Sequence, residues 1–360
     1  MKYRIPIAVS LCTLPLLVAW SLPRAAVRFA PDSGVALTKT FSYVLETEMN
    51  DMSTLVNGAD PGMSPSVESS STTTRTLSIT DVYKEVEDGR PLKLVRTYDE
   101  ISHVIDNPLS IEMMGESQEA NMHGTGSSDL SGKSVVFAYD ADAEEYSATF
   151  AEGEDGDDDA LSELAEDLDL RALLPAGEVS EGDSWSIDIE TIVDVLFPGG
   201  NIPIDVESDG DDSPMGAGDP FAIADPRMLF GEADGEATGT FAGMREVDDV
   251  MVAVIELEIT VDSSVEMTEF LAETVAESGP EGMDIGLESA DSEWTYEGSG
   301  ELLWNTNGGF MHSLELEGEV ETVHEQEMSL DMGGQSMSIE QTIEESGTFK
   351  HSASATAAKN

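Results

Sequence analysis

The 360-residue chain has a single cysteine, Cys12, so intrachain disulfide bonds cannot contribute to its fold. Cys12 also lies inside an N-terminal apolar run, which excludes thiol chemistry from the folded part. Basic residues are scarce, with 16 Lys and Arg against 74 Asp and Glu. The resulting net charge of −58 repels phosphate backbones, and we therefore exclude nucleic acid as a partner.

The chain also lacks the short motifs that mark catalytic and cofactor sites. It has no G-x-S-x-G sequence, and its five histidines are scattered without a partner at metal-ligand spacing. Gly126–Ser134 resembles a phosphate-binding loop but has one residue too many between its glycines, and a strand-like segment follows it. We predict a non-enzymatic protein without catalytic or cofactor-binding residues, although the many carboxylates leave a hidden acid–base pair open.

Long apolar runs are missing except at the N-terminus. Ile5–Leu22 carries no charge and follows Lys2 and Arg4, a pattern typical of a signal peptide, with Ala19–Ser21 as the cleavage site. The run is also long enough for an uncleaved anchor. We predict residues 1–30 as a signal peptide or N-terminal anchor. The rest is then periplasmic or extracellular, and touches a membrane only through that segment.

The chain does contain many segments in which apolar and polar residues alternate with the period of a β-strand. The longest exceed the usual strand by twofold or more, which favours large curved antiparallel sheets. The predicted strands are Val35–Met49, Thr76–Glu85, Leu92–Tyr98, Lys133–Asp140, Tyr146–Phe150, Ser184–Phe197, Ala237–Val247, Val250–Val261, Glu293–Asn305, Phe310–Leu330 and Gln335–Phe349.

Two segments have helical spacing. We predict a helix at Ala160–Leu174, because its apolar residues share one helix face. Acidic residues precede this helix, and Pro175 ends it. In Ser263–Ser278 a capping box begins a second helix, although Val261–Met267 also fits a continued strand. We expect irregular structure in three further places, namely Asp106–Ser131, the acidic loop 198–236 and a disordered tail at 351–360.

The segment Leu173–Glu190 connects the predicted helix to a strand. Pro175 stops the helix, Gly182 and Asp183 turn the chain, and Trp185 begins an alternation with Ile187. We therefore assign Pro175, Gly182, Asp183 and Trp185 structural roles, with Trp185 facing the core.

Asp155, Asp157 and Asp159 are the candidate metal ligands, because oxygen donors at alternate positions are typical of calcium loops. The sixth loop position holds Ala160 where such loops have glycine. We favour an alternative in which the acids form a solvated turn at the helix start.

Three short matches in the same order indicate a divergent duplication. Glu85–Asp88 matches Glu246–Asp249, and Ser110–Met113 matches Ser264–Met267. The third pair is Gly132–Ser134 and Gly298–Gly300. The predicted organisation is a first β-rich repeat at 34–152, an acidic loop, helix and connector at 153–183, and a second repeat at 184–350.

The sequence around the connector resembles a known family. Leu174-Pro175, Val179 and Gly182-Asp183-Ser184-Trp185 are similar to the LP-x3-V-x2-GDSW signature of exported bacterial β-rich proteins, abundant in planctomycetes, whose activity is uncharacterised. Trp304 and the following LELEGEVE strand resemble that family as well. The resemblance implies a mainly β (α+β) fold with one or two packed helices, similar to lipoprotein-carrier half-barrels. It implies no catalytic residue.

Two functions remain open from the sequence. The first is an exported protein that binds an apolar or lipid-linked ligand in a curved sheet, because its 17 methionines suit an adaptable apolar surface as well as a core. The alternative is an acidic envelope or surface interaction protein without a small ligand, with weak calcium binding at most. Either way the expected partner is a lipid or an envelope component.

Overall fold

The computed structural model describes residues 24–62, 66–113, 116–208, 232–269, 271–272, 284–332 and 335–358. Thirteen strands form one sheet with antiparallel pairing, so the prediction of a mainly β, antiparallel fold is confirmed. The strands are β1 Ala36–Val56, β2 Ser66–Glu87, β3 Arg90–Met113, β4 Glu116–Ser127, β5 Ser134–Asp140, β6 Glu145–Phe150, β7 Ser184–Ile187, β8 Asp205–Ser208, β9 Glu232–Val247, β10 Val250–Glu266, β11 Asp284–Asn305, β12 Phe310–Met332 and β13 Gln335–Ala357.

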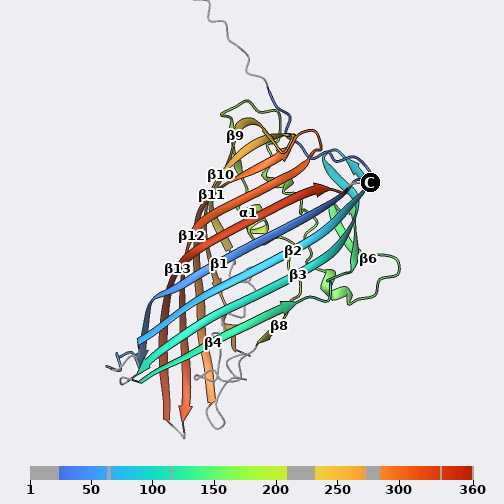
Figure 1. Cartoon of the computed structure of the whole chain (residues 1–360). Helices are drawn as coiled ribbons and strands as arrows, with labels where there is room; N and C mark the ends of the chain where they lie inside the picture. Colours follow the sequence, from blue (N-terminus) through green and yellow to red (C-terminus); the bar gives the residue numbers. More distant parts are fainter. Residues whose placement is uncertain are drawn as a thin grey trace, which may run out of the picture.

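The first and last strands lie side by side in the middle of the sheet (Figure 1). From that pair the order runs β1-β2-β3-β5-β6 in one direction and β13-β12-β11-β10-β9-β7 in the other, while β4 pairs with β3 and β8. Tight hairpin turns join β2 to β3 at Asp88-Gly89 and β9 to β10 at Asp248-Asp249, where all four residues have positive φ. We call the end of the sheet with these turns the upper end.

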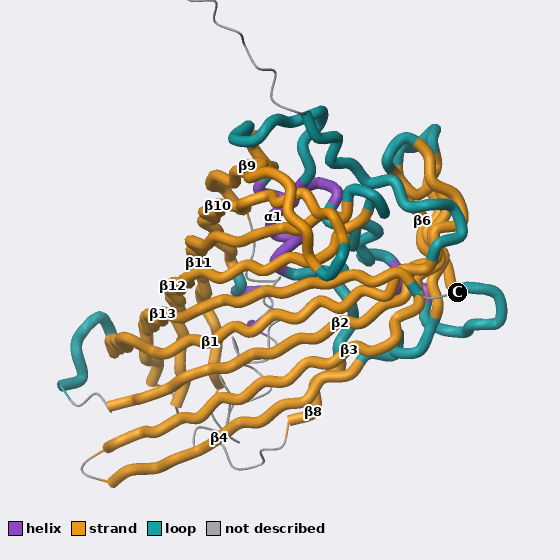
Figure 2. The backbone as a smooth tube through the Cα atoms, turned by 45° about the horizontal axis from the view of Figure 1, so that its top comes forward, coloured by secondary structure: helices purple, strands orange, loops and turns teal. Residues whose placement is uncertain are grey.

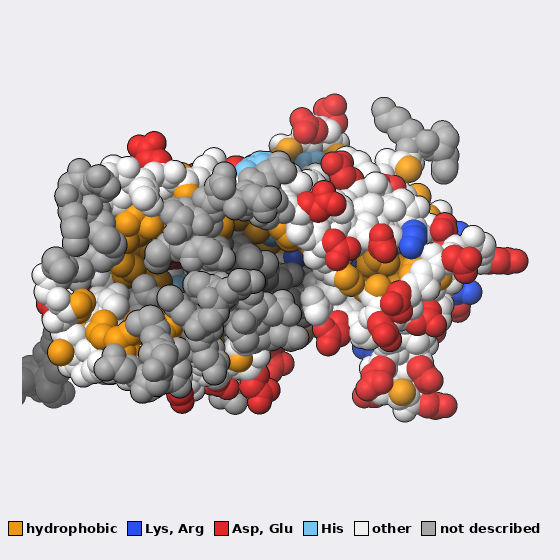
Figure 3. Space-filling model, turned by 90° about the horizontal axis from the view of Figure 1, so that it is seen from below, with side chains coloured by type: hydrophobic (Ala, Val, Ile, Leu, Met, Phe, Trp, Pro, Cys, Tyr) orange, Lys and Arg blue, Asp and Glu red, His pale blue; other side chains and the backbone are white. Residues whose placement is uncertain are grey.

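Strict alternation separates a concave from a convex face. On β12, Leu314, Leu316 and Val320 are buried on the concave side, whereas Glu317 and Glu319 are exposed on the convex side. Viewed from the lower end, hydrophobic side chains gather inside the sheet and acidic side chains project from its outside (Figure 3). Along β12 the convex side is therefore in contact with water.

The chain between β6 and β8 covers the concave face at the upper end (Figure 2). It contains the short 3-10 helices η1 Asp158–Leu161 and η2 Arg171–Leu173, strand β7, and the helix α1 Ile189–Leu196. Its apolar side chains, including Leu173 and Ile192, join those of the sheet in one core. The lower halves of the long strands extend beyond this cover.

The sheet splits between β1 and β2 in its lower half. Their pairing ends at Glu48↔Ser70, after which a bulge at Met49/Asp51 directs β1 along β13 while β2 continues along β3. Gly347 permits this bend, because a Cβ there would lie 1.8 Å from a backbone oxygen of β1. Pro108 has no N–H group, and the β2–β3 pairing is interrupted beside it.

The predicted helix at Ala160–Leu174 is wrong. Only η1 and η2 are helical there, and Leu170 between them has a φ of 58°. The Asp167 carboxylate accepts a hydrogen bond from the Asp169 backbone N–H, a local turn that competes with helix formation. Of the apolar residues expected on the helix face, Leu161 and Leu168 are buried and Ala172 is exposed, all within an irregular segment.

The predicted strand Ser184–Phe197 is correct only up to Ile187. Asp188 then caps α1, since its carboxylate accepts a hydrogen bond from the Glu190 N–H. Residues after Asp188 follow helical spacing, and Ile192 and Leu196 are buried on one face. The alternation of Trp185 and Ile187 therefore indicated a strand correctly, but the predicted strand extended beyond its end at Ile187.

Three irregular predictions are also corrected. The stretch Asp106–Ser131 contains all of β4 and the end of β3, and the tail predicted as disordered continues as β13 to Ala357. Loop 198–236 contains β8 and the start of β9, with residues 209–231 outside the described part. At Ser263–Ser278 the strand alternative holds to Glu266, and helical residues occur from Thr268 to 272, beyond which the segment is not described.

Residues 24–30 belong to the folded part. Ala25 pairs with Val179, Val27 and Phe29 are buried, and the Trp304 indole donates to the Arg28 carbonyl oxygen. Folded structure thus begins before residue 30, and the predicted signal segment Ile5–Leu22 lies outside the described residues. Within the described part of the chain, no helix combines the length and apolar character needed to cross a membrane.

The four residues assigned structural roles lie together near β7 and β9. Gly182 has a φ of 89°, and the Asp183 carboxylate accepts from the Ser180 N–H across the turn. Trp185 lies over Gly239, where a Cβ would come within 2.7 Å of its ring, and its indole donates to the Leu173 carbonyl oxygen at 3.1 Å. The duplication itself stays a prediction.

We expect Trp185→Ala to lower the free energy of unfolding by roughly 3 kcal/mol, because a large packed side chain is removed. Trp185→Phe retains most of the contact over Gly239 and should lower it by about 1 kcal/mol, the size of one hydrogen bond. Urea unfolding followed by circular dichroism measures both. An alanine variant as stable as the parent would contradict this packing.

Candidate functional site

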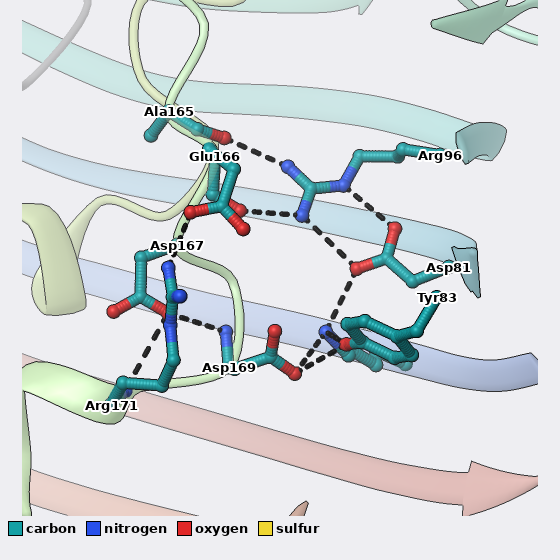
Figure 4. A network of polar contacts seen from close by, with 9 residues as sticks. Asp81, Tyr83, Arg96, Ala165, Glu166, Asp167, Asp169 and Arg171 are labelled. Carbon is teal, nitrogen blue, oxygen red and sulfur yellow. Dashed lines mark hydrogen bonds and ion pairs between the residues drawn. The ribbon is translucent and has the colours of Figure 1, made fainter. Parts of the chain in front are cut away.

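A network of buried charges lies under the upper cover (Figure 4). At its centre is Lys39 of β1, 1% exposed, whose Nζ lies 2.8 Å from Asp81 Oδ2 and 2.6 Å from Asp169 Oδ1. It also donates to the Tyr83 hydroxyl oxygen at 2.7 Å, and that hydroxyl donates to Asp169. Strands β1 and β2 are thus joined to the covering segment through one ammonium group.

Arg96 of β3 makes the second link. Its Nε and Nη2 atoms donate to the two Asp81 oxygens at 2.9 and 3.0 Å, and it donates to the backbone carbonyl oxygens of Ala165 and Glu166 at 2.8 Å each. Arg171 contacts the Glu166 carboxylate and donates to Asp167 at 3.0 Å. The irregular segment is therefore fixed to the sheet mainly by charge-assisted hydrogen bonds.

Burial and pairing act in opposite directions on the acids of this network. Burial tends to raise the pKa of Asp81, but the charges of Arg96 and Lys39 outweigh it and lower that pKa. For Glu166, burial dominates over the attraction of Arg171 and raises its pKa to about 7. The carboxyl of Glu166 consequently titrates near neutral pH.

The partners of these side chains already come from within the chain. Lys39, Arg96 and Arg171 each hold at least two described partners, and Lys39 and Arg96 are almost wholly buried. Substrate would have no access to them. We interpret the network as the structural clamp that closes the upper end.

A second group of buried polar residues lies below the clamp, in the middle of the concave face. Register places His103, Arg75, Tyr43 and His351 next to one another across β3, β2, β1 and β13. Further down, Ser292 of β11 lies opposite His324 of β12. We call this group the polar band; its buried members are Thr47, Thr73, Arg75, His103, Asn107, Ser263, Ser292, Thr322, His324 and His351.

Two histidines of the band, His324 and His351, are uncharged at neutral pH. Burial lowers the pKa of His324 and of His351 to about 4, because removal from water disfavours the imidazolium ion. The His351 ring is stacked on Phe349 with centroids 6.5 Å apart, and Tyr296 meets the same Phe349 ring edge-on at 5.8 Å. The Phe349 ring thus supports both the imidazole of His351 and the ring of Tyr296.

Below the polar band the inward residues become apolar again but remain partly exposed. On β12 and β13, Met328 pairs with Ile339 and Leu330 pairs with Met337, all facing the concave side. We call this surface the apolar rows; its members are Val67, Leu109, Ile111, Met122, Leu287, Met328, Leu330, Met337, Ile339 and Ile343.

A cavity of about 750 Å³ opens where β1 and β2 separate. Its lining includes concave-facing residues such as Met49 and Leu109 together with convex-facing residues such as Glu48 and Glu68. Because side chains of both faces line one cavity, the split is an opening through the sheet.

The acids predicted as metal ligands are placed differently from a metal centre. Asp155, Asp157 and Asp159 are all exposed, and the Asp157 carboxylate accepts from the Asp159 backbone N–H as the cap of η1. Among the described residues, no three His, Cys, Asp or Glu side chains are grouped as metal ligands. The capping role agrees with the alternative favoured from the sequence.

Neither the clamp nor the polar band was predicted from the sequence. Lys39 and Arg75 stand in or beside β-type alternation, where the phase of the strand marks them as inward residues. His103 and Asn107 fell in or near a stretch predicted as irregular, and His351 in the predicted tail. His324 is buried on the inward side of β12.

No family model and no curated protein matches the chain. Among solved structures, the outer membrane protein OprG from Pseudomonas aeruginosa is 7% identical over 89% of this chain and 97% of that chain, with a TM-score of 0.22. The transport unit of the autotransporter AIDA-I from Escherichia coli is 6% identical over 88% and 90%, with a TM-score of 0.23. These TM-scores are too low to support conclusions about fold or function.

Removing the central cation of the clamp should be strongly destabilising. Lys39→Met leaves Asp81 and Asp169 buried beside each other without their shared partner, and we expect a loss of roughly 3–5 kcal/mol in the free energy of unfolding. Lys350→Met is the matched control, since Lys350 on β13 makes an exposed pair with Glu317. Its loss should stay below about 1 kcal/mol in the same urea titration.

The raised pKa of Glu166 predicts a pH dependence of stability. Its folded pKa of about 7 exceeds the usual 4.5, so the folded state holds this proton more tightly and its contribution to stability falls as pH rises from 4.5 to 7. We expect the stability difference between Glu166→Gln and the parent to shift in favour of the variant across that window, by on the order of 3 kcal/mol.

Glu178→Gln, at an exposed position of the same covering segment, is the control for the removal of one negative charge. Chemical unfolding at several pH values measures all three proteins. Parallel stability curves for the parent and Glu166→Gln would show that the carboxyl is not held protonated.

Proposed function

We propose that the chain is an exported, non-enzymatic protein that binds an apolar or lipid-linked ligand on the lower half of its concave face. The observation that carries the proposal is the apolar rows. Their side chains face inward on neighbouring strands, beyond the cover of the upper end, and remain partly exposed. Partly exposed apolar surface of this kind is typical of interaction and ligand sites.

The composition of the rows supports an adaptable ligand surface. Met122, Met328 and Met337 contribute flexible, polarisable side chains that can adjust to different apolar shapes. The packed core above uses mostly branched and aromatic side chains instead, including Leu37, Phe41 and Ile79 in its sheet face. Three methionines therefore lie where packing within the described chain is incomplete.

The opening between β1 and β2 supplies a lateral route to the concave face. It connects the convex side to Met49, two residues from Thr47 of the polar band, and to Leu109 of the apolar rows. An apolar chain entering there would pass acidic residues at the mouth and reach apolar residues inside. Such a route suits a protein that accepts its ligand from the surrounding solution or from another protein.

The direct experiment is mass spectrometry of organic extracts from the full chain purified under native conditions. We expect at least one apolar species in near-stoichiometric amount, absent from a parallel extract of an unrelated exported protein. A folded protein that extracts empty would instead support the acidic surface interaction protein that binds no small ligand.

Binding to the apolar rows can be tested with N-phenyl-1-naphthylamine, a neutral dye that fluoresces on apolar surfaces. Ile339→Lys places a charge on the concave face and should weaken dye binding at least about tenfold, since an unpaired charge resists burial. Glu340→Lys introduces the same side chain one residue along, on the exposed side of β13. It should leave dye affinity unchanged within about twofold; equal losses in both variants would contradict the placement of the site.

A further inference from the structure

Four buried side chains in and beside the polar band have a hydrogen-bonding atom without a partner among the described residues. These atoms are Asn107 Oδ1, Ser292 Oγ, Tyr296 Oη and both ring nitrogens of His351. The four residues are 7%, 1%, 0% and 2% exposed, respectively. Each unsatisfied buried group costs about 1–3 kcal/mol. They lie on the concave side of β3, β11 and β13, in and beside the polar band, and indicate a hydrogen-bonding partner that the described chain does not supply.

Tyr296 and His351 are held on one aromatic platform. The Tyr296 ring lies across two glycines, since a Cβ at Gly298 would be 2.0 Å from its Oη and a Cβ at Gly318 would be 2.4 Å from a ring carbon. Phe349 contacts both the Tyr296 and the His351 rings. Glycine at these positions leaves space for the tyrosine to lie flat, and so fixes its hydroxyl on the concave side.

The charge balance of the band favours a neutral partner. Among its described inward residues, the fixed charges are one base, Arg75, and one acid, Glu345, and Glu345 accepts a hydrogen bond from Thr322. His324 and His351 are neutral because burial lowers their pKa to about 4. A charged ligand group buried here would need an excess of the opposite charge in the band, and the band has no such excess. Hydroxyl groups match better, because they donate to amide or imidazole acceptors and accept from tyrosine and serine.

On the basis of the proposed function, we propose that the ligand is an uncharged amphiphile bearing at least one hydroxyl group. Its hydroxylated end lies against Asn107, Ser292, Tyr296 and His351, and its apolar skeleton lies along the apolar rows. The order of surfaces from the upper to the lower end gives the ligand one orientation, with the polar group deepest.

The test uses the full chain stripped of bound lipid, with N-phenyl-1-naphthylamine as the probe and three competitors of equal chain length. These are 1-decanol, decanoate and decyltrimethylammonium. We expect 1-decanol to displace the dye at a concentration at least about tenfold lower than either ion, because the ions lose hydration without gaining a counter-charge.

Tyr296→Phe and Ser292→Ala each remove one unpartnered hydroxyl. Each should raise the 1-decanol concentration for half displacement about fivefold, the factor that one net hydrogen bond provides. Dye affinity itself should stay within about twofold, because the apolar rows are intact. Tyr98→Phe is the matched control, since Tyr98 lies in the packed upper end and should not affect displacement. Thermal melting verifies that all three variants fold.

The outcomes separate two levels of failure. Preferential displacement by decanoate would overturn the inference in favour of an anionic ligand held by Arg75. Equal potency of all three competitors would show that the band does not distinguish their polar groups, and would overturn it too. Unchanged displacement in both hydroxyl variants would overturn it as well. If the dye fails to bind the parent at all, the proposed function falls with it.

Discussion

The buried Lys39 ammonium group is the interaction on which the rest of the structure depends. A cation on the concave face of a sheet is tolerable only with carboxylates at contact distance, and Asp81 and Asp169 supply them from β2 and from the covering segment. This requirement fixes the chain around Asp169 against the sheet. The remaining cover, including η2 and α1, then packs in one place and closes the upper end.

Closure of one end divides the concave face into three zones. The upper zone is a packed core, the middle zone is the polar band, and the lower zone carries the apolar rows. The inward side chains of the same strands form all three zones, whereas glutamates lie on their outward side. The alternation of inward and outward residues thus gives both a water-facing exterior and an amphipathic interior. Ligand recognition can change along a strand without disturbing the exterior.

Sequence reasoning predicted the strands and hairpins well because they follow local rules. The turns at Asp88 and Asp248 and the alternation of β12 depend on nearby residues only. The predicted helix at 160–174 was wrong, because Asp169 binds Lys39 and Asp167 binds Arg171. Helical spacing does not reveal these partners. The polar band was missed for the same reason, since only the register across β3, β2, β1 and β13 brings His103, Arg75 and His351 into one row.

The pairing of β1 with β13 has a consequence for how the molecule is made. Leu37 lies beside Ala357, so the middle of the sheet cannot form until both of these distant segments have been synthesised. Contacts between such distant positions form slowly, which leaves long strands with unsatisfied edges in the meantime. The net charge of −58 keeps unfinished copies apart during that interval. The acidity that shapes the mature exterior thus also serves as the chain's own protection against aggregation while it folds.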